Sequence, residues 1–125
     1  MVSAAAFRLW APVVLMAAII FAFSSIPSLS SGLGTWDLVL RKLAHLTEYA
    51  VLGALLQRAL ARPGVAILVG GLYAATDELH QHFVRGRHGA WYDVVIDTVG
   101  VTIGVVVWNR SRWGSAAAAH PPTRA

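Results

Sequence analysis

Residues 9–26 read LWAPVVLMAAIIFAFSSI, a segment without a charged side chain. A transmembrane helix needs about 20 mostly apolar residues to cross the roughly 30 Å of hydrocarbon in a bilayer. A secretory signal peptide is the alternative interpretation, with Arg8 as its charged start and residues 22–24 as its cleavage site. The segment is long for a signal peptide and further apolar segments follow it, so we predict a transmembrane helix.

Three more apolar segments follow, at about residues 36–60, 64–81 and 91–109. Lipid offers the backbone no hydrogen-bond partners, and the alternating pattern of a β-barrel is absent, so each crossing must be helical. The sequence therefore predicts an all-α membrane protein, a four-transmembrane-helix bundle with short loops. Residues 1–113 form its single domain, and residues 114–125 form a disordered tail.

The composition favours a membrane protein over other classes. Hydrophobic residues make up 57% of the 125-residue chain and charged residues 13%, whereas a soluble domain carries about 25% charged residues. The chain has no cysteine, which excludes disulfides and thiolate metal sites. Its net charge of +4 comes from scattered residues that form no basic stripe, so we predict no nucleic-acid partner.

The basic residues also predict an orientation. With the N-terminus in the cytoplasm, six of the ten Lys and Arg residues lie inside, namely Arg8, Arg58, Arg62, Arg110, Arg112 and Arg124. The other four lie outside, namely Arg41, Lys42, Arg85 and Arg87. Because cytoplasmic loops carry an excess of Lys and Arg, we predict that both termini are cytoplasmic.

The ionisable residues gather toward one end of the predicted bundle. Successive helices run in opposite directions, so the start of the second helix, the end of the third and the start of the fourth share the outer half of the bilayer. A carboxylate within a membrane costs a few kcal/mol, so these groups should face the bundle and mark a functional site. A salt-bridge network that only locks the helices together is the alternative. The candidate ligand-binding residues are Lys42, His45, Glu48, Asp77, Glu78, His80, Gln81, Arg85, Arg87, Asp93 and Asp97.

Small residues continue one of these polar faces. Asp93, Asp97, Gly100 and Gly104 recur at helical spacing in the fourth segment. Small residues on a helix allow close approach of a neighbouring helix in a membrane. We therefore predict close packing along this face.

Potential metal ligands occur at two places in the sequence. His45 and Glu48 lie one turn apart, and Glu78, His80 and His82 alternate along the chain. This spacing matches no strong zinc signature, and nearby arginines compete for the carboxylates. The sequence accordingly predicts no metal ion, and no cofactor is expected.

Four motifs resemble those of the VanZ-like family. Residues 23–27 read FSSIP, residues 42–53 read KLAHLTEYAVLG, residues 77–87 read DELHQHFVRGR and residues 93–100 read DVVIDTVG. The resemblance covers about residues 8–108. It implies a multi-pass protein of the bacterial plasma membrane and suggests a role in the cell envelope or in teicoplanin-type antibiotic resistance. Two positions depart from the common family pattern, since Arg85 stands where proline is frequent and Asp97 where asparagine also occurs.

Three functions remain open from the sequence. The first is an outward-facing polar pocket that binds an anionic envelope lipid or a glycopeptide-related ligand, with Arg85, Arg87 and Lys42 holding phosphate or carboxylate. The second is a membrane-embedded enzyme acting on a lipid-linked substrate. The third is a small proton-coupled carrier. Membrane lipids are the expected partners in all three, and the sequence does not predict an oligomeric state.

Overall fold

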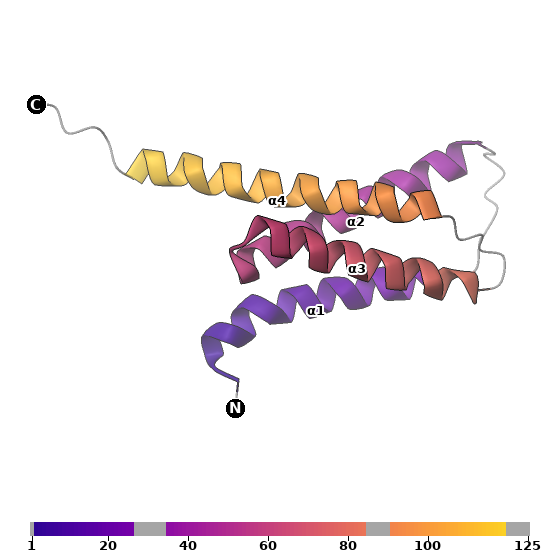
Figure 1. The fold of residues 1–125 in the computed structure, drawn as a ribbon, viewed down its shortest axis with the longest axis horizontal. Coiled ribbons are helices and arrows are strands. Elements are labelled where there is room, and N and C mark those ends of the chain that lie inside the picture. The colour runs from indigo at the N-terminus through magenta and orange to yellow at the C-terminus, as the bar shows by residue number, and fades with distance from the viewer. Residues whose placement is uncertain (1, 27–34, 85–90, 120–125) are drawn as a thin grey trace, which may run out of the picture.

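The computed structural model describes residues 2–26, 35–84 and 91–119. Four helices occupy this part of the chain: α1 (Ala4–Ser24), α2 (Thr35–Leu60), α3 (Pro63–His82) and α4 (Trp91–Ala119), as Figure 1 shows. Two helical segments are long and apolar enough to cross a membrane, namely α1 and residues Trp91–Arg112 of α4. The all-helical architecture predicted from the sequence is confirmed.

Two helix boundaries differ from the predicted ones by more than two residues. Helix α1 begins at Ala4 rather than near residue 9, because the Ser3 side chain caps it by accepting a hydrogen bond from the Ala6 N–H at 3.1 Å. Helix α4 extends to Ala119, beyond the predicted end near residue 109. It thus includes residues 114–119 of the predicted disordered tail. Residues 116–119 are all alanine, the residue with the highest helix propensity. Residues 120–125 of that tail lie outside the described residues.

Helices α2 and α3 are joined by two residues, Ala61 and Arg62. Ala61 adopts a left-handed conformation (φ 55°) and its N–H donates to the Gln57 carbonyl at 2.8 Å, which ends α2. Arg62 is extended, as a residue before proline prefers to be. Pro63 then occupies the first turn of α3, where its missing N–H is not needed. This connection makes α2 and α3 an antiparallel hairpin.

The most extensive helix packing is between α2 and α4. A side chain added at Gly53 would overlap the backbone carbonyl of Val101, and one added at Gly104 would overlap that of Ala50. The two backbones therefore approach more closely than any side chain allows, as in other small-residue helix contacts of membrane proteins. The close packing predicted for this face of α4 is confirmed.

The bundle has apolar side chains on its outer surface and several polar ones inside. Large hydrophobic residues are exposed on every helix, among them Val14, Phe21, Leu40, Val51, Leu68, Leu72, Val99 and Ile103. Buried polar residues are Ser24, Gln57, Asp77, Glu78, Gln81 and Asp97. Since soluble proteins rarely bury ionisable groups while exposing so many large apolar ones, this distribution is typical of a lipid-facing bundle.

Glycine-to-alanine substitutions test the close α2–α4 contact. We expect Gly104→Ala to destabilise the protein by about 1–3 kcal/mol, because the added methyl group forces the backbones apart. Gly64→Ala is the matched control, since nothing lies within 4 Å of the methyl group it adds. Thermal unfolding of the purified proteins in detergent gives the comparison. A midpoint for Gly104→Ala equal to that of Gly64→Ala would contradict the close contact.

Candidate functional site

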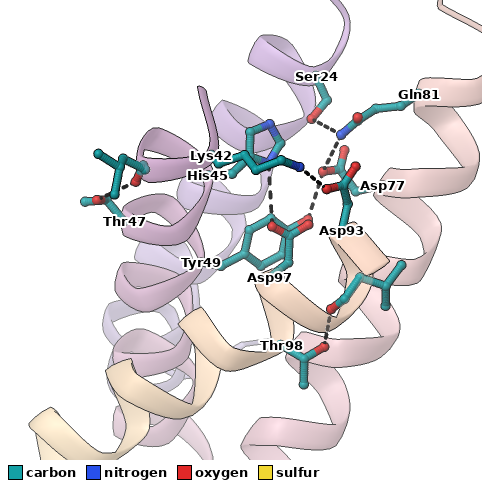
Figure 2. A network of polar contacts seen from close by, with 12 residues as sticks. Ser24, Lys42, His45, Thr47, Tyr49, Asp77, Gln81, Asp93, Asp97 and Thr98 are labelled. Atoms are coloured by element: carbon teal, nitrogen blue, oxygen red, sulfur yellow. Dashed lines mark hydrogen bonds and ion pairs between the residues drawn. The ribbon is translucent and has the colours of Figure 1, made fainter. Parts of the chain in front are cut away.

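The polar side chains lie at one end of the bundle. The end of α1, the first half of α2, the end of α3 and the start of α4 meet there, while α1 begins and α4 ends at the other end (Figure 1). Figure 2 shows the resulting network, to which all four helices contribute. We call its members at this end the polar cluster: Ser24, Lys42, His45, Tyr49, Asp77, Gln81, Asp93 and Asp97.

Asp77 lies at the centre of the polar cluster and is 3% exposed. Its Oδ2 accepts a hydrogen bond from the Tyr49 hydroxyl at 2.9 Å and a longer one from the Gln81 amide at 3.4 Å. The Gln81 amide also donates to the Ser24 hydroxyl at 3.4 Å. One carboxylate thus connects α2 with α3, and Gln81 extends the connection to α1.

A second pair joins α2 to α4. His45 Nδ1 lies 3.8 Å from Oδ1 of Asp97, which is also 3% exposed. Asp77 is close by, since one ligand atom from each of His45, Asp77 and Asp97 lies within 4.8 Å of the other two. An imidazole and two buried carboxylates from three helices therefore converge on one point.

Lys42 and Asp93 form an ion pair at the more exposed edge of the cluster. The side chain of Lys42 is 36% exposed, and its ammonium also lies 5.3 Å from the centre of the Tyr92 ring. A cation over an aromatic ring gains about 0.5–1 kcal/mol at an exposed site. This pair ties the first half of α2 to the start of α4.

His80 contacts α1. Its Nε2 lies 2.9 Å from the Ser25 hydroxyl, and its ring stacks on Phe21 with centroids 4.3 Å apart. The remaining predicted acids are Glu48, partly buried on α2, and Glu78, buried on α3. Arg85 and Arg87 lie outside the described residues. The described candidate residues are thus brought to one end of the bundle.

A comparison with known families identifies the family of the chain. Residues 7–112 match the family model described as VanZ/LLP1. The chain belongs to the VanZ/LLP1 family. The match spans the polar cluster and confirms the resemblance seen in the sequence motifs, and together with the two apolar helices it supports a membrane protein. No curated protein and no solved structure matches the chain.

Two residues of the polar cluster were not predicted from the sequence. Tyr49 is fully buried and donates to Asp77, and Ser24 accepts from Gln81. Tyr49 lies one helical turn after His45, which was a detectable signal. Ser24 gave no such signal, because its role depends on how α1 packs against α3.

Removing one hydroxyl tests the importance of the Tyr49–Asp77 hydrogen bond. We expect Tyr49→Phe to destabilise the protein by about 1–3 kcal/mol, because a buried carboxylate oxygen loses its shorter hydrogen bond. Tyr92→Phe removes the same atom from an exposed ring and should change the stability little. Thermal unfolding in detergent measures both. Equal midpoints for the two variants would show that the buried hydroxyl contributes nothing.

Proposed function

We propose that this VanZ/LLP1 protein is a multi-pass protein of the bacterial cell membrane and that all four helices cross the bilayer. We further propose that its polar cluster forms an outward-facing site that binds the anionic headgroup of an envelope lipid. The observation that carries the proposal is the burial of polar groups from four helices at one end of a bundle with an apolar surface.

The burial pattern supports membrane crossings by α2 and α3 as well as by α1 and α4. Helices α2 and α3 have 26 and 20 residues, which corresponds to roughly 30–39 Å at 1.5 Å per residue. Their polar residues Gln57, Asp77 and Gln81 are buried, whereas residues such as Leu68 and Leu72 are exposed. The buried polar groups lower the mean hydropathy of these two helices, although lipid would contact mainly their apolar sides.

The charge distribution supports an outward-facing cluster. Arg8, Arg58 and Arg62 lie at the end of the bundle opposite the cluster, with the Arg58 guanidinium donating to the Arg8 carbonyl at 3.2 Å. Arg110 and Arg112 follow toward the end of α4. By the positive-inside rule, these basic residues support a cytoplasmic location for this end and for both termini.

Basic and aromatic groups near the cluster support a lipid headgroup as ligand. Lys42 is partly exposed at its edge, and Trp36 and Trp91, at the starts of α2 and α4, are exposed. Tryptophan at the end of a membrane helix is typical of the headgroup region. The sequence adds Arg85 and Arg87 between α3 and α4, and arginine binds phosphate or carboxylate through a planar, bidentate fork. Binding an envelope lipid would also fit a role in the teicoplanin-type resistance that the sequence resemblance suggests.

Reporter fusions test the topology. A fusion after residue 63 and one after residue 113 should give a cytoplasmic signal, and a fusion at residue 88 should give an external one, because the helices alternate in direction. Paired alkaline phosphatase and green fluorescent protein fusions read the two sides independently. A cytoplasmic signal at residue 88 would overturn the outward orientation.

Lipid retention tests the headgroup proposal. We expect Arg87→Lys to retain about fivefold less anionic lipid through purification, because lysine keeps the charge but loses the bidentate fork. Arg112→Lys is the matched control, since Arg112 is exposed near the other end of α4. Mass spectrometry of lipid extracted from wild type and both variants gives the comparison. Equal retention in all three proteins would refute binding by Arg87.

A further inference from the structure

We infer that His45, Asp77 and Asp97 form a binding site for a divalent metal ion, with Zn²⁺ the cation that fits best and Mn²⁺ its closest competitor. Zn²⁺ binds imidazole nitrogen and carboxylate oxygen, and many zinc sites use three protein ligands and keep a fourth position open. Mn²⁺ is the competitor because it favours carboxylate oxygen. This site goes beyond lipid binding and does not depend on it.

The distances between the ligand atoms suit a small cation. Ligands about 2.0–2.1 Å from a tetrahedral Zn²⁺ lie roughly 3.3 Å from one another. His45 Nδ1 and Asp97 Oδ1 are 3.8 Å apart, and the Asp77 ligand atom lies within 4.8 Å of both. Small side-chain rotations bring three such atoms to a common ion. The sequence predicted no metal ion, because the spacing of potential ligands matches no zinc signature and arginines lie near the carboxylates. His45, Asp77 and Asp97 come from three different helices, so their convergence produces no such spacing along the chain.

The two oxygens of Asp77 have different surroundings. Oδ2 accepts hydrogen bonds from Tyr49 and Gln81, whereas Oδ1 is buried and has no hydrogen-bond partner among the residues that the structure describes. A carboxylate that binds a metal through one oxygen is commonly oriented by hydrogen bonds to nearby groups. Tyr49 and Gln81 supply that orientation through Oδ2, which leaves Oδ1 available to a cation.

The charges of the site also favour a cation. Asp77 and Asp97 are each 3% exposed and their carboxylates approach within 4.8 Å, so two negative charges would repel each other with little solvent screening. The nearby ammonium of Lys42 forms its ion pair with Asp93 and not with Asp77 or Asp97. A divalent ion offsets both buried charges at once, which an ion pair with one lysine cannot do.

Metal uptake by the full-length protein tests this inference. Tag-free protein in detergent is treated with a chelator, dialysed against Zn²⁺ alone or Mn²⁺ alone, and analysed for bound metal. We expect about one Zn²⁺ per wild-type chain, with binding at least about tenfold weaker in His45→Gln and in Asp97→Asn. His82→Gln and Asp37→Asn are the matched controls, because they make the same chemical changes at an exposed residue of α3 and in the first turn of α2. Both should bind like wild type.

Each outcome decides the inference. Loss of metal from the two site variants with retention in the two controls supports it. Equal uptake by all five proteins, or no uptake of either metal by wild type, overturns it. If Asp97→Asn fails to fold, the His45→Gln variant alone tests the inference. The imidazole ring of His45 is only partly buried, so its replacement should be tolerated. The melting temperature provides a second measurement: Zn²⁺ should raise it in wild type but not in His45→Gln. Bound metal and retained lipid are measured separately, so lipid binding and metal binding can fail independently.

Discussion

The polar cluster depends on the close approach of α2 and α4. Gly53 lies against the backbone of Val101, and Gly104 lies against that of Ala50, so the two helices are in contact without intervening side chains. Dispersion between closely packed backbones drives helix association in lipid, where the hydrophobic effect between helices is absent. The same contact holds His45 of α2 within 3.8 Å of Asp97 of α4. A wider spacing would separate these groups and leave buried charge without nearby polar atoms.

The interior of the bundle therefore combines polar contacts with an apolar core, whereas many of its exposed residues are large and apolar. Tyr49 and Gln81 donate to the same carboxylate oxygen of Asp77 inside the bundle, while α2 and α3 present leucine and valine outward. This division explains why only α1 and part of α4 have the length and composition of a membrane span among the described helices. The polar groups of α2 and α3 lower their average hydropathy, although many of them would not contact lipid.

The sequence predicted the four helices, the close packing of one α4 face and the family, because these follow from apolar segments, helical periodicity and local motifs. It also predicted that the described candidate residues lie at one end, which follows from the alternating direction of successive helices. The partners of individual atoms were not predictable. The contacts from Tyr49 to Asp77 and from His45 to Asp97 depend on the rotation of each helix about its axis, which spacing along the chain does not determine. The orientation in the membrane and the roles of Arg85 and Arg87 stay predictions.

The two-residue connection between α2 and α3 has a consequence for how the family can vary. His45 and Asp77 lie the same number of residues from Ala61, one before it and one after it. An antiparallel hairpin with a tight turn therefore sets them at the same height. Inserting one residue within α3 before Asp77 would turn Asp77 by about 100° and shift it by about 1.5 Å along the helix. Insertions and deletions between these two residues should consequently be rare among sequences that keep the site.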